Sequence, residues 1–218
     1  MLIEVDGVQT LVCTFQNRSF FKPAGASPVN MREKQCIKVN SPLVKKPITQ
    51  AGTFDWQTFL KKHLYSLLTA LDGVYQEPRY HPEGDALYHS LQVFQLAYQT
   101  CTDPELWAAA LLHDIGKAIS TPNHAQIGAN ELEGFLSERI VWLIRHHLDL
   151  LVAPRSTRRR LRHSHQLREL ELLRAWDLKG RSPTATVMGP REAINILIQH
   201  GSSLLPRNET AHDNNAFG

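Results

Sequence analysis

The sequence predicts an all-α fold, a bundle of helices preceded by an irregular or short β-hairpin extension. Apolar residues recur at three- and four-residue steps between Trp56 and Leu71, which is the spacing of one face of an amphipathic helix. Residues 1–52 instead contain short β-prone runs between proline- and glycine-containing loops, with no helical period. We therefore expect an extension or linker over 1–52 and a helical domain over 53–200.

Cap and breaker residues divide the helical domain into segments. Thr53 is the expected N-cap of the first helix, because a hydroxyl there can accept a backbone N–H. The polar, aperiodic segment 201–218 is expected to be a disordered tail. Signals such as Asp103-Pro104 and Gly180 bound further helices, expected at 85–100, 103–113, 123–136, 137–150, 165–178 and 190–200.

Composition places the chain among ordinary globular proteins. It has 218 residues, of which 42% are hydrophobic and 21% charged, and a formal net charge of +3. These values exclude wholesale disorder, and the charge is too small to mark the whole chain as a nucleic-acid binder. The three cysteines are widely spaced, which argues against a disulfide framework or a cysteine zinc site. With no signal-peptide pattern and no long apolar run, we expect a cytoplasmic protein.

The main candidate for chemistry is the adjacent pair His113-Asp114. A strongly apolar helical stretch, Leu106 to Leu112, runs directly into this pair. Imidazole nitrogen and carboxylate oxygen suit divalent cations, and one aspartate can bridge two ions. Gly116 is expected to let the chain turn away after the pair. The pair therefore predicts a metal site at the end of a buried helix.

Other candidate ligands lie on separate predicted helices. An isolated histidine is more often a hydrogen-bonded core or surface residue than a ligand. A polar side chain in an apolar helix is costly without a partner, however, and shared metal coordination would offset that cost for several residues together. The candidates of this kind are His89, His124, His146, His147 and Asp177. No ligand role is expected for His63, His81, His163, His165, His200 and His212.

In the order His89, His113-Asp114 and Asp177, these residues resemble the H…HD…D signature of the HD phosphohydrolase superfamily, an all-helical fold. Residues 78–182 are most similar to the HD domain of bacterial tRNA nucleotidyltransferases. The segment Pro82 to His89 resembles its PEGD…H motif. Three further elements agree: Leu112 to Lys117, the His124-xxx-Gly128 pair, and Asp177 to Arg181, which is similar to D-x-x-G-R.

The resemblance implies a divalent-metal-dependent phosphatase and phosphodiesterase that acts on nucleotides or RNA ends such as 2′,3′-cyclic phosphates. It does not imply addition of nucleotides, because the chain shows no glycine-rich strand followed by paired aspartates. Residues Ile115 to Lys117 also differ from alarmone hydrolases, in which a Glu-Asp pair follows. One or two ions are expected, with nickel, cobalt, manganese, magnesium or iron all open.

We assign expected roles within this site as follows. An ion held by the ligand set would bind a phosphate oxygen and lower the pKa of a water, with Asp114 essential. Lys117 and Arg181 are the expected catalytic and substrate-binding cations, and Arg145 is a weaker substrate-binding candidate. His124 and the pair His146-His147 either complete a two-metal site or contact the phosphate. Of that pair, His146 is preferred as the ligand.

A basic run of six arginines spans Arg155 to Arg168. Such a run can contact an RNA backbone, and Arg158 and Arg159 at its centre are the expected contacts. The alternative is a solvated loop, since no aromatic residue interleaves the run to stack on bases.

Two other functional classes remain open from the sequence. Mixed-valent di-iron oxygenases with an HD-like fold use a similar His/Asp set, so metal identity would separate them from hydrolases. A non-catalytic HD module that binds a nucleotide or RNA is the third reading. The physiological substrate and the oligomeric state are not predicted.

Overall fold

The computed structural model describes residues 3–5, 8–10 and 55–206, and the chain divides into two units, Met1–Gln50 and Ala51–Gly218. In the first unit, strand β1 (Ile3–Val5) pairs antiparallel with β2 (Val8–Thr10), and Ile3 lies opposite Thr10. A short hairpin was one of the two forms expected for the extension.

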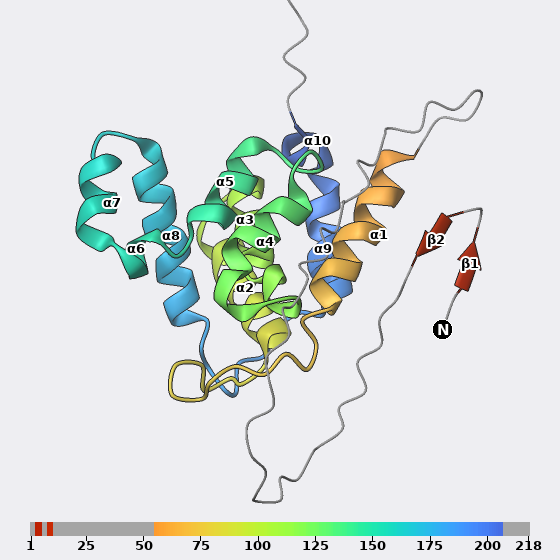
Figure 1. Ribbon diagram of the computed structural model, residues 1–218, viewed down its shortest axis with the longest axis horizontal. Coiled ribbons are helices and arrows are strands. Elements are labelled where there is room, and N and C mark those ends of the chain that lie inside the picture. Colours follow the sequence, from red (N-terminus) through yellow and green to blue (C-terminus); the bar gives the residue numbers. More distant parts are fainter. Residues whose placement is uncertain (1–2, 6–7, 11–54, 207–218) are drawn as a thin grey trace, which may run out of the picture. The chain divides into compact units, whose positions relative to one another are not determined.

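The second unit is helical, which confirms the predicted fold class (Figure 1). Within residues 55–206, extended pairing is limited to two isolated bridges, Tyr75 with Asp85 and Glu133 with Leu136. In chain order its elements are α1 (Trp56–Thr69), α2 (Ala86–Thr100), α3 (Pro104–Leu112), the 3-10 turns η1 (Ile115–Ala118) and η2 (Thr121–Asn123), α4 (His124–Leu132), α5 (Glu138–His146), α6 (Asp149–Val152), α7 (Pro154–Arg160), α8 (His165–Lys179), α9 (Pro190–Gln199) and α10 (Gly201–Leu204).

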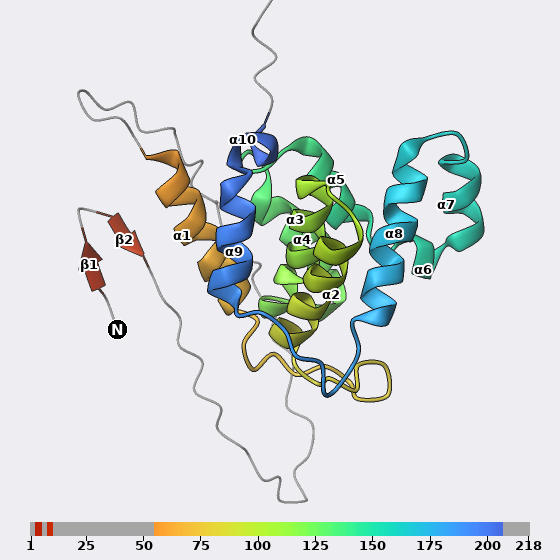
Figure 2. The ribbon, with the colours of Figure 1, turned by 180° about the vertical axis from the view of Figure 1, so that it is seen from behind.

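Helix α3 forms the centre of this unit. Its residues from Leu106 to Leu112 are all buried, as expected for a helix that is apolar on every side. Helices α2, α5, α8, α9 and α10 contact it. Seen from the front and from behind, α1 and α9 lie together on one side, and α8 with α6 and α7 lies on the other (Figures 1 and 2).

A charged cluster ties three of these helices together. Arg139 on α5 lies 2.6 Å from Asp103 Oδ2 and 2.6 Å from Glu105 Oε2, both at the start of α3. It also lies 2.8 Å from Glu169 Oε1 on α8. Burial raises the pKa of Asp103, but the hydrogen bonds and charge of Arg139 outweigh this and hold the pKa below its usual range. Arg139 therefore links the ends of α3, α5 and α8.

The element boundaries differ from prediction in several places. Asp55, rather than Thr53, caps α1, because its carboxylate accepts the backbone N–H of Thr58 at 3.1 Å; Thr53 lies outside the described residues. The helix expected over 123–136 ends at Leu132. The helix expected over 137–150 ends at His146 and is followed by the short α6.

The basic run is not an irregular loop. Residues Pro154–Arg160 form α7, which begins at a proline, a residue that suits the first turn of a helix. Helices α6, α7 and α8 pack together and form what we call the basic arm, residues 149–179 (Figure 1).

The first residues of the expected disordered tail are ordered. Gly201–Leu204 form α10, the side chain of Leu204 is buried, and the carbonyl of Leu204 accepts the backbone N–H of Ser137 at 2.7 Å. Residues 207–218 lie outside the described part of the chain. Among the described helices, none combines the length and apolar character needed to cross a membrane.

Candidate metal centre

Five elements bring the predicted ligands together in one buried place. His89 comes from α2, His113 ends α3, Asp114 precedes η1, His124 begins α4 and Asp177 lies near the end of α8. All five residues are buried, as is His147, which directly follows α5. Buried polar side chains of this kind need partners, so their convergence is the first sign of a site.

Asp114 is the central residue, because each of its carboxylate oxygens faces a different pair of histidines. Its Oδ2 lies 3.3 Å from His113 Nε2 and 3.9 Å from His89 Nε2. Its Oδ1 lies 3.1 Å from His124 Nε2 and 3.7 Å from His147 Nε2. These are two ligand groups joined by one aspartate, and the donor atoms of each group lie within 4.8 Å of one another.

Asp177 adds a second carboxylate on the side of His89. Its Oδ1 lies 3.3 Å from His89 Nε2. That nitrogen is buried and makes no aligned hydrogen bond within the described residues. Burial raises the pKa of Asp177, but the close approach of His89 and the neighbouring positive groups lower it far below the usual range. Asp177 is therefore an anionic ligand candidate next to an unpaired imidazole nitrogen.

The four histidines share one orientation. In each ring Nδ1 lies within hydrogen-bond distance of a backbone carbonyl, which can only accept, so Nδ1 carries hydrogen and Nε2 is the nitrogen that faces the centre. The pairs are His89 with Gly180 at 2.9 Å, His113 with Ala110 at 2.9 Å, His124 with Thr121 at 2.6 Å and His147 with Ile144 at 2.7 Å.

The electrostatics of the site favour a cation. Burial raises the pKa of Asp114, but the neighbouring His113 and Lys117 outweigh it and hold the pKa well below its usual range, so this carboxylate is ionised. Burial lowers the pKa of His147 to about 3. Burial also lowers the pKa of His89, but interactions with Asp177 and Glu83 outweigh it and raise this pKa to about 9. Without a metal, therefore, a proton occupies the position at His89 Nε2 that a metal ion would take.

Two glycines set the distances between the ligand-bearing elements. A Cβ on Gly116 would lie 2.1 Å from the carbonyl oxygen of His124, so η1 and α4 touch through backbone alone. A Cβ on Gly180 would lie 2.7 Å from Val93 Cγ2, where the end of α8 meets α2. Gly116 is thus needed for close approach, a different reason from the change of direction expected from the sequence.

Lys117 and Arg181, the two expected catalytic cations, both lie at the centre. Lys117 Nζ is 2.6 Å from Asp114 Oδ2 and donates to Gln76 Oε1 at 2.5 Å. Arg181 donates from Nη2 to Asp177 Oδ1 at 2.8 Å and from Nη1 to the carbonyl of Tyr80 at 2.9 Å. Each cation is held by a ligand carboxylate, and their roles in the reaction stay predictions.

The structure reverses the preference for His146 over His147. His147 faces Asp114, whereas His146 Nδ1 lies 3.0 Å from Asp149 Oδ2, and its ring packs 4.6 Å from that of Trp142. The apolar face of α5 indicates from the sequence which of the two histidines points inward. Buried Ile140 and Ile144 are spaced by four residues, and His147 follows at the next three-residue step of the same face.

The other predicted substrate-binding arginines lie elsewhere. Arg145 Nη2 lies 3.3 Å from Glu133 Oε2, away from the ligand cluster. Arg158 and Arg159 are exposed on α7, where Arg158 pairs with Glu171 at 3.1 Å. The structure therefore separates these three arginines from Lys117 and Arg181.

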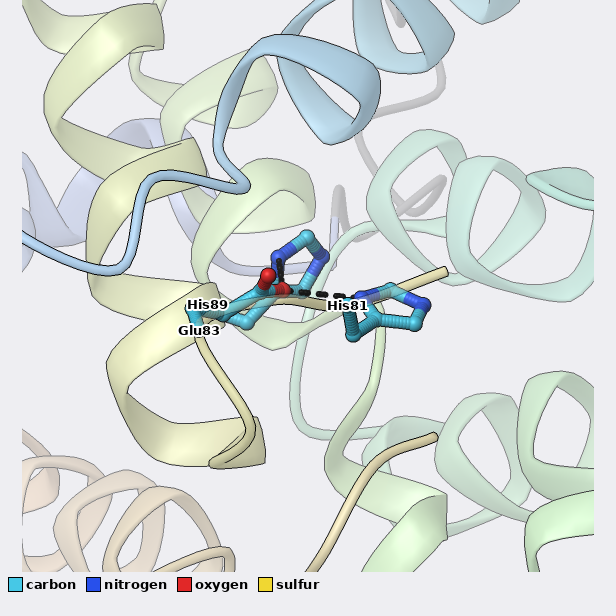
Figure 3. Close-up of side chains that lie close together, drawn as sticks. All are labelled: His81, Glu83 and His89. Atoms are coloured by element: carbon cyan, nitrogen blue, oxygen red, sulfur yellow. Dashed lines mark hydrogen bonds and ion pairs between the residues drawn. The ribbon is translucent and has the colours of Figure 1, made fainter. Parts of the chain in front are cut away.

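One carboxylate at the centre was missed as a functional residue. The side chain of Glu83 is fully buried, and its Oε1 lies 2.8 Å from His89 Nδ1 and 2.8 Å from His81 Nδ1 (Figure 3). Glu83 precedes α2 in a loop, where helical periodicity carries no information. His81, for which no ligand role was expected, is thereby connected to the site.

The donor set as a whole fits a divalent cation. Imidazole nitrogens and carboxylate oxygens are the ligands of zinc, iron, cobalt, nickel and manganese sites. Within the described residues, the buried Nε2 atoms that face Asp114 share no other partner than this carboxylate. The two groups around Asp114 provide separate positions on its two oxygens. The chain thus contains a buried His/Asp cluster able to hold metal ions.

Comparison with known proteins agrees with this geometry. Residues 86–179 match the family model described as HD domain. A multifunctional CCA protein from Methylococcus capsulatus is 44% identical over 61 residues, covering 28% of this chain and 14% of that protein. One from Hahella chejuensis is 36% identical over 84 residues, covering 35% of this chain and 20% of that protein.

A multifunctional CCA protein from Acinetobacter baumannii is 42% identical over 59 residues, covering 27% of this chain and 14% of that protein. The chain therefore spans a fifth or less of the length of these relatives. The matched residues include all six ligand candidates, from His89 on α2 to Asp177 on α8. This confirms the predicted resemblance: residues 86–179 match an HD domain, and this part of the chain is similar to the matched part of multifunctional CCA proteins.

Proposed function

We propose that the protein is a divalent-metal-dependent phosphohydrolase that acts on nucleotides or RNA ends, such as 2′,3′-cyclic phosphates. The convergence of four imidazole Nε2 atoms on Asp114 carries this proposal. Burying so many imidazoles around a carboxylate is costly unless they share a partner, and a metal ion is a partner that several of them can bind together. The relation to multifunctional CCA proteins supports a nucleotide or RNA substrate.

We further propose two ions, with Asp114 as the bridging ligand. His89, His113 and Asp177 would hold one ion together with Asp114 Oδ2, and His124 and His147 would hold the other together with Oδ1. In support, His124 Nε2 and His147 Nε2 lie 3.1 Å apart, and both face Asp114 Oδ1. A second ion bound by both nitrogens would fit this arrangement.

The mechanism divides into what the metal supplies and what the chain does. When bound, a divalent ion polarises the phosphate and lowers the pKa of water. Arg181 has five N–H groups, of which three are engaged by Asp177 and Tyr80, so two remain for phosphate oxygens. Lys117 has one N–H left beside Asp114 and Gln76. Both cations can therefore stabilise the charge that develops on the phosphate.

The basic arm is the proposed contact for an RNA substrate. Arg155, Arg158, Arg159, Arg160, Arg162 and Arg168 are all exposed. Arg158 and Arg160 form ion pairs with Glu171 and Asp149, at 3.1 and 2.7 Å, which leaves an excess of positive charge on α7. Such a surface binds phosphate backbones without reading their sequence.

A substrate panel tests the proposed activity. The metal-free protein would be incubated with 2′-, 3′- and 5′-nucleotides and 2′,3′-cyclic nucleotides, each with nickel, cobalt, manganese, magnesium or iron. We expect release of phosphate, or opening of the cyclic ester, that depends on a divalent metal. Oxygen consumption with two irons per chain would favour the oxygenase reading. Binding of a nucleotide or RNA without turnover under any metal would favour the non-catalytic module.

A further inference from the structure

The loop between α1 and α2 is attached to the metal centre at three points. Gln76 accepts from Lys117, the carbonyl of Tyr80 accepts from Arg181, and Glu83 contacts His89. The loop is also closed on itself, since the backbone N–H of Gln76 donates to the carbonyl of Gly84 at 2.9 Å. A segment fixed in this way can hold a charged side chain at a defined place beside the site.

Glu83 is the charged side chain that this loop buries. Its Oε1 accepts a hydrogen bond from His81 Nδ1 and forms an ion pair with His89 Nδ1, at 2.8 Å in each case, while Oε2 has no hydrogen-bond partner in the described part of the chain (Figure 3). Burying an ionised carboxylate is costly, so its retention needs a compensating interaction. The two imidazole N–H groups are the interaction that the structure provides.

Glu83 restricts His89 to one tautomer. His89 Nδ1 lies between two oxygens, Glu83 Oε1 at 2.8 Å and the Gly180 carbonyl at 2.9 Å, and neither can donate a proton when Glu83 is ionised. Nδ1 must therefore carry hydrogen, and Nε2 is left as the metal-facing atom, 3.3 Å from Asp177 Oδ1. An anionic acceptor behind an imidazole also increases its basicity as a metal ligand.

The same oxygen orients His81. Its Nδ1 donates to Glu83 Oε1, and its ring lies edge-on to that of His89, with the centroids 4.9 Å apart. The side chain of His81 is 17% exposed, whereas that of His89 is fully buried. His81 therefore lies at the solvent-facing edge of the site.

We propose that Glu83 is a positioning residue that fixes two histidines with one oxygen: it turns His89 Nε2 toward the metal and His81 Nε2 toward the edge of the site. The proposal rests on the metal centre proposed above. The three residues also form a cluster of potential metal ligands. The carbonyl of Gly180 favours hydrogen bonding over metal binding by these three residues. It accepts from His89 Nδ1, so that nitrogen carries a proton and cannot bind a metal.

The test uses the full chain and the variants Glu83→Gln and Glu83→Ala, with Glu77→Gln as the matched control because Glu77 is exposed in the same loop. Cobalt binding to the metal-free proteins would be measured by calorimetry. We expect about 10- to 100-fold weaker binding for Glu83→Ala, a smaller loss for Glu83→Gln, and no change for Glu77→Gln. Equal cobalt affinity in all four proteins would overturn the proposal.

A second readout needs no metal. Long-range ¹H–¹⁵N spectra of the metal-free protein report which nitrogen of each histidine carries hydrogen. We expect Nδ1–H for both histidines in the wild type and a mixture of tautomers for His81 in Glu83→Ala; unchanged tautomers would contradict the proposal even if the variant were less stable. A wild-type chain that binds no cobalt would overturn the metal centre instead, and the spectra would still decide the role of Glu83.

Discussion

His124 Nε2 and His147 Nε2 lie 3.1 Å apart on the two helices that flank Asp114 Oδ1. The Nδ1 atom of each ring donates to a carbonyl of its own segment, so the two Nε2 atoms are the ones that face each other. Either a proton or a cation shared by the two nitrogens accounts for this distance. Metal content in variants of these histidines therefore tests whether an ion binds there.

Replacing His147 should remove one of two ions. For His147→Ala we expect about half the metal per chain found in the wild type, because the group on Asp114 Oδ1 loses a ligand while the group on Oδ2 is kept. His146→Ala is the matched control and should keep the wild-type metal content, because His146 pairs with Asp149. Metal analysis after dialysis measures both; the reverse pattern would restore the preference made from the sequence.

Replacing Asp114 should abolish metal retention and turnover together. Among the described residues, Asp114 is the one that faces both ligand groups, so we expect Asp114→Ala to lose at least 100-fold in activity. Metal at 100 times its dissociation constant should stabilise the wild type by about 2.7 kcal/mol, and the variant by almost nothing. Thermal unfolding with and without metal measures this. Asp72→Asn, at an exposed position, should behave as the wild type.

The Arg139 cluster should make stability depend on pH. In the folded state the pKa of Asp103 is held below its usual range. The ionised carboxylate therefore stabilises the fold at any pH above its unfolded-state pKa of about 3.9. This stabilisation is lost as the pH falls through the lower pKa of the folded state. Arg139→Met should lower the free energy of unfolding by about 2 kcal/mol at pH 7 and by less at pH 3.

Urea unfolding of the metal-free protein at several pH values measures this difference. The control is Arg168→Met on α8, since Arg168 is exposed and outside the Arg139 cluster; we expect a change within about 0.5 kcal/mol. A destabilisation by Arg139→Met that is the same at both pH values would mean that packing, rather than charge, accounts for the effect.

The basic arm should bind RNA in a salt-dependent manner. Replacing Arg155 and Arg159 with Gln removes two exposed charges from α7. Affinity for a short single-stranded RNA should fall about 10-fold, and the slope of log K against log salt should become less steep by about 1.4. The double variant Lys61→Gln and Lys62→Gln removes two exposed charges from α1 and should have no such effect. Anisotropy titrations would show whether the two double variants differ.

Most of the fold could be read from the sequence, because amphipathic spacing determines which residues face the core. The N-cap at Asp103 and the buried α3 follow directly from the residue pattern. Helix α10 could not be predicted, because its sequence is polar and it is held by a distant hydrogen bond to Ser137. A contact of this kind depends on tertiary packing rather than on local preference.

The centre was predictable to the extent that its residues lie on periodic helices. His147 continues the buried face of α5, whereas His146 does not, so the helical spacing distinguishes the two histidines. Glu83 and His81 lie in a loop, where no period relates sequence to orientation. Their role depends on how the loop folds back over α2, and only the three-dimensional arrangement shows it.

The contact between Gly116 and the backbone of His124 has a consequence for the spacing of the two ligand groups on Asp114. Main-chain atoms meet there with no side chain between them. The distance between η1, which follows Asp114, and α4, which begins at His124, is therefore fixed by the backbone. Substitutions in the surrounding apolar core can alter stability while leaving that distance unchanged. Any side chain at position 116 would instead lengthen it, and the bridging carboxylate could then no longer reach both ligand groups.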